Sequence, residues 1–151
     1  MQIQKNFSLK SFNTFGIDTK ARYFSKFSNL EELSILTTHV SRLTSHGSRL
    51  TTFILGGGSN VLFTGDYNGL MLKNEVMGIE KSGEDDDHVY IKVGAGENWH
   101  QLVLHCVKNN WAGIENLSLI PGNAGAAPIQ NIGAYGVELH EMFHELSAFL
   151  L

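Results

Sequence analysis

The sequence predicts an α/β or α+β fold, and three observations favour that class. Apolar and charged residues make up 42% and 17% of the 151-residue chain, which are proportions typical of a globular protein. A chain of this length suits one compact domain with a buried core. Short β-branched and apolar runs that end at glycines alternate with longer segments whose apolar residues recur at helical spacing.

A first helix is expected to begin near Ser28. The run Ser28-Asn29-Leu30-Glu31 has the pattern of a capping box, in which a hydroxyl and a carboxylate satisfy the first free amides of a helix. Apolar residues then recur with helical spacing at Leu30, Leu33, Val40 and Leu43. Gly47 suits the C-cap of this helix.

Three strands are expected after that helix. Thr51–Leu55 is a β-branched and apolar run stopped by three glycines, which predicts a buried strand. Val61–Phe63 and Leu70–Leu72 predict two further strands around a turn at Gly65–Gly69.

A hairpin with a charged tip is expected next. Ile79 and Val89–Val93 flank the acidic run Glu84-Asp85-Asp86-Asp87. A calcium loop is the alternative, but the run lacks the alternating ligand spacing and the terminal glutamate of such loops.

A second helix is expected from Asn98 to about Asn110. Asn98 and Gln101 can cap its start. Its apolar stripe consists of Trp99, Leu102, Val103, Cys106 and Val107. Cys106 on this stripe indicates a core residue and not a nucleophile.

The final apolar run, Leu146–Leu151, predicts a strand that the chain leaves half finished, and hence a protein that continues.

Charge and composition exclude several classes of partner. The formal net charge is −4, and no run of Lys or Arg is present, which argues against nucleic acid and anionic membranes. The polar N-terminus lacks the apolar core of a signal peptide, and no apolar run approaches the ~20 residues of a membrane helix. The single cysteine allows no internal disulfide, which is compatible with a reducing compartment.

A run of three glycines directly follows the predicted strand 51–55. In Gly56, Gly57, Gly58, Ser59 and Asn60 the glycines let the backbone turn tightly and approach a ligand, and their amides can hold phosphate oxygens. The run matches neither the dinucleotide fingerprint nor a Walker A loop. A strained turn between two strands is the equally supported alternative.

A second segment rich in small residues spans Ile120–Gly136. Small side chains leave room for a flat or extended ligand against the backbone. Gln130, Asn131 and Tyr135 supply amide and hydroxyl groups for the polar edge of such a ligand. A loop buried against a neighbouring domain is the alternative.

These segments occur in an order that resembles a known family. The motifs are Asn13-Thr14-Phe15-Gly16, Gly56–Asn60, Gly94–Trp99, Gly113–Leu117 and Ile120–Gly136. Together they resemble the UDP-N-acetylenolpyruvoylglucosamine reductases, flavoenzymes of peptidoglycan precursor synthesis. The resemblance covers nearly the whole chain, and the segment 120–136 is its most specific part, although Asn123-Ala124 departs from the family's usual residues there.

The resemblance implies a two-lobed FAD-binding fold of the vanillyl-alcohol-oxidase (PCMH) type. The lobes are expected over residues 1–75 and 76–151, with a boundary near Lys73–Gly78. The chain is expected to be truncated before the substrate domain. The resemblance also implies that FAD contacts the glycine run and ten residues of the later segment. These are Gly56, Gly57, Gly58, Ser59, Asn60, Pro121, Gly122, Gly125, Ala126, Ala127, Gln130, Asn131, Gly133, Ala134 and Tyr135.

The family's catalytic residues are expected beyond Leu151. They are an arginine that holds the substrate carboxylate, a serine that donates a proton and a glutamate. In the whole enzyme NADPH reduces FAD, and a hydride passes to the enolpyruvyl group of a UDP-sugar in the cytoplasm. The chain alone is therefore expected to be inactive. A non-catalytic flavin-binding or scaffold fragment and another FAD-linked oxidase are the alternatives.

Two further features carry weaker hypotheses. His140-Glu141-Met142-Phe143-His144 matches a zinc motif, but it follows a glycine-rich segment and precedes a predicted strand, so no metal is expected. Glu97 and Glu115 are expected to be structural, with Glu97 near a helix N-terminus and Glu115 bonded to local backbone.

Binding of the FAD diphosphate is expected to depend on backbone amides. Neither glycine-rich segment contains Lys or Arg, and the nearest bases, Arg49 and Lys73, lie outside the first one. Amide dipoles with Ser59 and Asn60 are therefore expected to neutralise the charge, and binding is expected to depend only modestly on salt.

Overall fold

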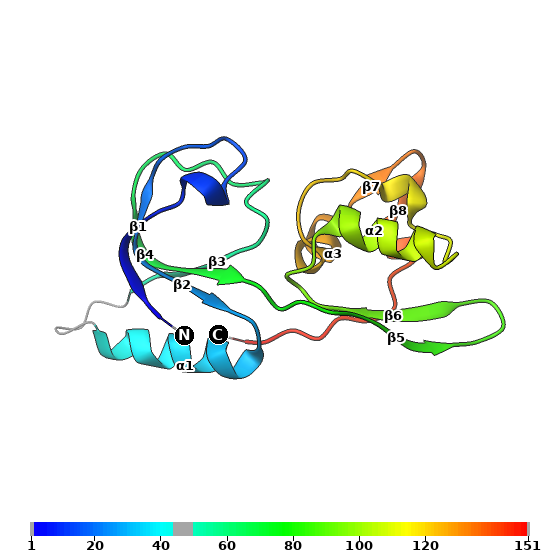
Figure 1. Ribbon diagram of the computed structural model, residues 1–151, viewed down its shortest axis with the longest axis horizontal. Helices are drawn as coiled ribbons and strands as arrows, with labels where there is room; N and C mark the ends of the chain where they lie inside the picture. Colours follow the sequence, from blue (N-terminus) through cyan, green and yellow to red (C-terminus); the bar gives the residue numbers. More distant parts are fainter. Residues whose placement is uncertain (1, 44–49, 151) are drawn as a thin grey trace. The chain divides into compact units, whose positions relative to one another are not determined.

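The computed structural model describes residues 2–43 and 50–150, shown as a ribbon in Figure 1. The chain divides into two compact units, Met1–Glu75 with Phe149–Leu151, and Val76–Ala148. Helices and strands are mixed in the described residues, so the α/β (α+β) class is confirmed.

The first unit is built on a four-stranded sheet in the order β1-β2-β4-β3. Strand β1 (Gln4–Ser8) is antiparallel to β2 (Lys20–Phe27), whereas β4 (Tyr67–Asn74) is parallel to β2 and to β3 (Thr52–Leu55). A 3₁₀ turn, η1 (Lys10–Phe12), follows β1, and helix α1 (Leu30–Leu43) follows β2. The core of this sheet contains Leu9, Ala21, Phe24, Leu55 and Met71.

The start of α1 differs from the predicted capping box by one residue. The Asn29 side-chain oxygen accepts a hydrogen bond from the Glu32 N–H at 2.9 Å, and the Glu32 carboxylate accepts from the Ser28 N–H at 2.7 Å. The backbone N–H and then the hydroxyl of Ser28 lower the pKa of Glu32. The prediction with Ser28 and Glu31 was wrong because Asn29 is itself a good cap. Gly47, the expected C-cap, lies outside the described residues.

The side chains of α1 follow the predicted spacing only in part. Leu33 and Leu36 are buried, but Leu30 is exposed at the first turn. Val40 and Leu43 lie within the helix, and their side chains are outside the described set.

Strand burial in this unit differs from the prediction. Strand β3 forms at the expected place, but it is an edge strand, and only Leu55 of its four residues is buried. Residues 61–63 form no strand, and Gly69 lies inside β4 and not in a turn. Leu70–Leu72 of β4 is fully buried, because this strand has a neighbour on both sides.

The second unit begins with the predicted hairpin. Strands β5 (Ile79–Glu84) and β6 (Val89–Val93) pair antiparallel. Helix α2 (Trp99–Lys108) follows, and the Asn98 side chain caps it by accepting from the Gln101 N–H at 3.1 Å. Both elements are confirmed.

The remaining elements of this unit are short. They are η2 (Glu115–Leu117), η3 (Ala124–Ala126), α3 (Ala127–Gln130), β7 (Gly133–Ala134), β8 (Val137–Glu138) and η4 (Leu139–Glu141). They surround a core of Trp99, Leu102, Val103, Cys106, Leu117, Ala127 and Leu139. Burial raises the pKa of the Cys106 thiol, as suits a core residue.

Two other predictions for this half of the chain were wrong. Val107 is 51% exposed, so it does not belong to the buried stripe of α2. Residues 146–150 form no strand. Of the helices that the structure describes, none is long and apolar enough to span a membrane.

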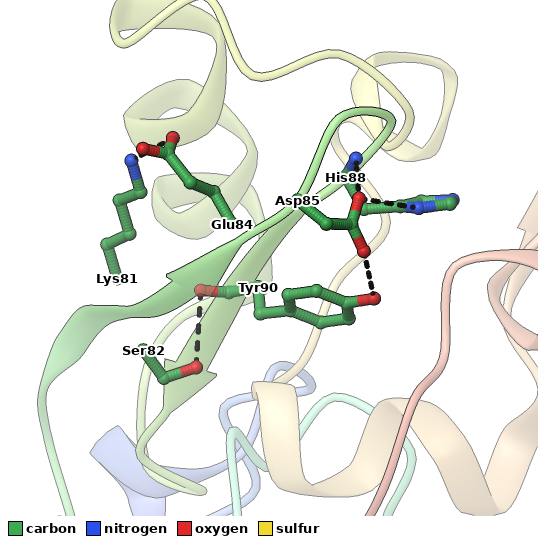
Figure 2. Close-up of polar contacts among 6 residues, drawn as sticks. All are labelled: Lys81, Ser82, Glu84, Asp85, His88 and Tyr90. Carbon is green, nitrogen blue, oxygen red and sulfur yellow. Dashed lines mark hydrogen bonds and ion pairs between the residues drawn. The ribbon is translucent and has the colours of Figure 1, made fainter.

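The tip of the β5–β6 hairpin is held by one carboxylate. Asp85 accepts a hydrogen bond from the Asp87 N–H at 2.9 Å. It also accepts one from the His88 N–H at 2.7 Å (Figure 2). The Tyr90 hydroxyl donates to the same carboxylate at 2.7 Å. These bonds, with that from Tyr90 largest, lower the pKa of Asp85 to about 2. The acidic run therefore forms an internally bonded turn.

Asp85→Asn is expected to lower the pKa of Tyr90. The Asp85 carboxylate raises that pKa above the ordinary value of 10.0, because the hydrogen bond that it accepts, and to a smaller extent its charge, favour the protonated phenol. Ultraviolet titration of tyrosinate measures the effect, and Asp86→Asn is the control that removes the same charge from the same tip. Equal titration curves for the two variants would contradict the contact.

The hydrogen bonds to the Asp85 carboxylate depend on its ionised form. Since the Asp85 pKa is depressed, these bonds contribute fully above pH 3.8 and are lost as the pH falls through about 2.

Candidate functional site

The glycine run Gly56–Asn60 leaves the end of β3 with two of its carbonyl groups held by protein donors. The Lys73 ammonium donates to the Gly56 carbonyl at 2.6 Å. The Thr14 N–H donates to the Gly58 carbonyl at 3.2 Å. In a trans peptide the N–H points away from its carbonyl, so the amides of Gly57 and Ser59 are directed away from these donors. Neither amide has a partner among residues 2–43 and 50–150. Amides without a protein partner suit an anion.

The three glycines differ in what an added side chain would meet. Gly58 has φ +70°, and a Cβ there would overlap the Phe12 carbonyl oxygen and lie 2.9 Å from its carbon. The requirement at Gly58 therefore comes both from its positive φ and from the Phe12 backbone. Gly57 is exposed, and a Cβ at Gly56 would meet open space. The exposed Gly57 is thus the position where a ligand can approach the backbone.

A buried asparagine supports the glycine run from the N-terminal motif. Asn13 donates to the carbonyls of Leu9 and Ile17 at 2.8 and 3.0 Å and accepts from the Ile17 N–H at 3.0 Å. These three bonds fix the turn that carries Thr14 to the Gly58 carbonyl. Asn13 and Thr14 were absent from the predicted site residues, although their motif was part of the family resemblance.

Lys73 was placed outside the glycine run by its sequence distance, but the structure brings the two together. Strands β3 and β4 pair in parallel with Leu55 opposite Lys73, so the lysine lies beside the residue that precedes Gly56. Burial lowers the pKa of Lys73, and Glu75 opposes this shift. The expectation that backbone amides mainly neutralise the diphosphate considered only cations near in sequence, and pairing across the sheet adds Lys73 to the neighbours of this segment.

The second candidate segment is compact structure and not an open loop. Pro121 and Gly122 precede η3, which carries Gly125 and Ala126, and α3 begins at the buried Ala127. Gly133 and Ala134 form β7, which pairs with β8.

The motif Gly94–Trp99 lies directly against this segment. The Ala124 N–H donates to the Glu97 carbonyl at 2.8 Å, and the Gly125 N–H donates to the Ala95 carbonyl at 3.1 Å. The buried Asn123 donates to the Gly96 carbonyl at 2.6 Å. A Cβ at Gly125 would lie 2.6 Å from the Cβ of Ala95, so packing between the two motifs explains the small residue there.

The polar side chains predicted for this segment differ in their surroundings. Asn131 donates to the Glu138 carboxylate at 2.7 Å and accepts from the His140 N–H at 3.2 Å, so both ends of its amide are occupied. Gln130 donates to the Ala126 carbonyl at 3.4 Å. Tyr135 is 89% exposed and has φ +53°, an uncommon conformation for a bulky residue. Strain of this kind is concentrated at functional sites.

The zinc-like motif does not lie on one helix. Turn η4 ends at Glu141, so His140 and His144 are not one helical turn apart. His140 lies 3.1 Å from the Glu138 carboxylate, and the His144 ring packs on Tyr90. No group of three metal-ligating side chains occurs in the part of the chain that the structure describes.

The two isolated glutamates have structural partners. Glu97 accepts from the Gly78 N–H at 2.7 Å, and Glu115 accepts from the Gly113 N–H at 2.6 Å. Backbone hydrogen bonds from its own N–H and from Gly113 lower the pKa of Glu115. The predicted local bonding of Glu115 is confirmed.

Comparison with known proteins gives one family and a set of similar enzymes. The FAD binding domain family matches residues 42–150. The UDP-N-acetylenolpyruvoylglucosamine reductase of Amoebophilus asiaticus is 52% identical over 148 residues, which cover 98% of this chain and 42% of that protein. The reductase of the same name from Flavobacterium johnsoniae is 46% identical over the same shares of the two chains. The chain thus spans about two fifths of the length of these relatives.

A solved structure shows the same fold. The crystal structure of UDP-N-acetylenolpyruvylglucosamine reductase from Thermus caldophilus matches with a TM-score of 0.70 at 23% identity. The match covers 92% of this chain and 46% of that one.

Proposed function

The chain belongs to the FAD binding domain family, and from this premise we propose that it is the flavin-binding part of a UDP-N-acetylenolpyruvoylglucosamine reductase. The observation that carries the proposal is the exposed Gly57 amide, which has no partner among the described residues. It lies in a glycine run in which Lys73 and Thr14 hold the carbonyls of Gly56 and Gly58. Relatives that are 46–52% identical over 98% of the chain bear the name of that enzyme.

The residues of the glycine run suit the diphosphate of FAD. The amides of Gly57 and Ser59 would donate to phosphate oxygens, and the Ser59 and Asn60 side chains would extend this set. In the second unit the exposed Tyr135 would contact the cofactor, together with Pro121, Gly122, Gly125, Ala126, Ala127, Gln130, Asn131, Gly133 and Ala134. A bound FAD supplies hydride chemistry, with NADPH as the donor and the enolpyruvyl double bond of UDP-GlcNAc-enolpyruvate as the acceptor.

The role proposed for these 151 residues is cofactor binding and not substrate chemistry. The product of the whole reaction would be UDP-MurNAc, a peptidoglycan precursor, which connects the protein to cell shape and division. NADPH and UDP-sugars are cytoplasmic metabolites, so we place the reaction in the cytoplasm. The resemblance places the family's catalytic arginine, serine and glutamate outside these residues, and we assign no catalytic residue to them.

A chimera tests the function. The chain would replace the matching segment of the Amoebophilus asiaticus reductase, to which it is 52% identical. The purified chimera is expected to be yellow, with about one FAD per chain, and to oxidise NADPH only when UDP-GlcNAc-enolpyruvate is present. The 151-residue chain alone is expected to hold FAD weakly and to show no turnover.

Four outcomes would contradict parts of this proposal. A folded chimera without flavin would contradict FAD binding. Flavin with oxidation of a different substrate would favour another FAD-linked oxidase. Turnover by the isolated chain would overturn the view that it is only the flavin-binding part, and stoichiometric flavin on it would indicate a self-sufficient binding module.

A further inference from the structure

Lys73 is a half-buried cation that pairs with no carboxylate of the residues that the structure describes. It lies near the end of β4, where its ammonium donates to the Gly56 carbonyl at 2.6 Å. The neighbouring carboxylate, Glu75, pairs with Lys26 at 2.7 Å. No carboxylate forms an ion pair with Lys73 within residues 2–43 and 50–150. Burial of an unpaired charge is unfavourable unless something compensates for it.

The bond from Lys73 acts on one peptide group. Because the peptide is planar and trans, holding the Gly56 carbonyl toward the lysine turns the Gly57 N–H to the opposite side. A cation on the carbonyl oxygen also polarises the peptide, which strengthens its N–H as a donor. An anion bound at that N–H would lie on the opposite side of the peptide group from Lys73 and would not contact the lysine.

We propose that Lys73 is a positioning residue for the anion site of the glycine run, where it orients and polarises the Gly56–Gly57 peptide toward a bound diphosphate. The proposal rests on the proposed FAD function. It adds a cation to the expectation that backbone dipoles, with Ser59 and Asn60, mainly neutralise the ligand, since Lys73 acts on a peptide dipole that would bind it. The carbonyl of Gly58, by contrast, accepts from the neutral Thr14 N–H. Of these two carbonyls, therefore, only that of Gly56 is bound by a charged donor.

The test compares three variants of the reductase chimera. Lys73→Met removes the charge and keeps the length of the side chain. Lys73→Arg keeps the charge. Lys5→Met removes a lysine charge from β1, the edge strand that lies farthest from β3 and its glycine run in the same sheet. FAD affinity is measured by quenching of flavin fluorescence at several salt concentrations, and far-UV circular dichroism checks the fold.

The expected results separate charge from packing. Lys73→Met is expected to weaken FAD binding about 10-fold, the effect of one charge-assisted interaction, and to reduce its salt dependence. Lys73→Arg is expected to remain within about threefold of the wild type, and Lys5→Met within about twofold.

The pH profile gives a readout that a purely structural role would not move. Glu75 and Lys26 are the charged groups that act on Lys73, and burial lowers its pKa below 10.5. The affinity of the wild-type chimera should therefore fall with rising pH before an ordinary lysine titrates, and that of Lys73→Arg should not.

Two results would overturn the inference. One is unchanged affinity and salt dependence in Lys73→Met. The other is equal weakening in Lys73→Met and Lys73→Arg with no difference in pH profile, which would mean that only the fit of lysine matters. A wild-type chimera that binds no FAD would instead refute the proposed function, so the two failures are distinguishable.

Discussion

In the chimera, Gly57→Val is expected to remove bound FAD while the far-UV circular dichroism stays near native. Gly57 is exposed, and its N–H has no partner among the residues that the structure describes, so the side chain would occupy the space in front of a free donor. A Cβ and its two methyl groups would keep a phosphate from that amide. Loss of these bonds is expected to weaken binding about 100-fold or more.

Gly65→Val is the matched control for that variant. Gly65 also lies between β3 and β4, and a Cβ there meets open space. Its flavin content is expected to equal that of the wild type, as measured by the absorbance of flavin released on denaturation. Normal flavin in Gly57→Val would mean that Gly56–Asn60 is a structural turn.

Gly58→Ala is expected to destabilise the first unit by about 2–5 kcal/mol. Two effects add at this position. The residue has φ +70°, which disfavours any Cβ, and the Cβ would overlap the Phe12 carbonyl oxygen, which is backbone and cannot rotate away. Urea denaturation of the 151-residue chain, followed by far-UV circular dichroism, measures the change.

Gly16→Ala separates the two effects. Gly16 has φ +63°, almost the value at Gly58, but a Cβ there meets nothing within 4 Å. Its loss is expected to be only the conformational part, about 1–2 kcal/mol. Equal losses in the two variants would show that the contact with Phe12 contributes nothing.

Features that depend on a few adjacent residues were predictable from the sequence. The cap at Asn98, the helix that follows it and the β5–β6 hairpin formed where expected. Each depends on local hydrogen bonds or on a periodicity within one element. The glycine run was recognised in the same way, since three glycines after a strand permit conformations that other residues rarely adopt.

Features that depend on distant residues were decided only by the tertiary structure. The sequence predicts that strand β3 is buried, but in the order β1-β2-β4-β3 it is an edge strand. The internal strand β4 contains the fully buried residues Leu70–Leu72. Gly58 is required by Phe12, and Gly125 packs against Ala95.

The clearest case is Lys73. The sequence by itself determined the fold class, the candidate segments and the family resemblance, because glycines, caps and apolar spacing act over a few residues. It placed Lys73 outside the site, 17 residues from Gly56. Parallel pairing of β3 and β4 places Leu55 beside Lys73. The glycine run, which follows Leu55, therefore begins next to this lysine. Strand order and register arise from burying the whole sheet, and no local pattern encodes them.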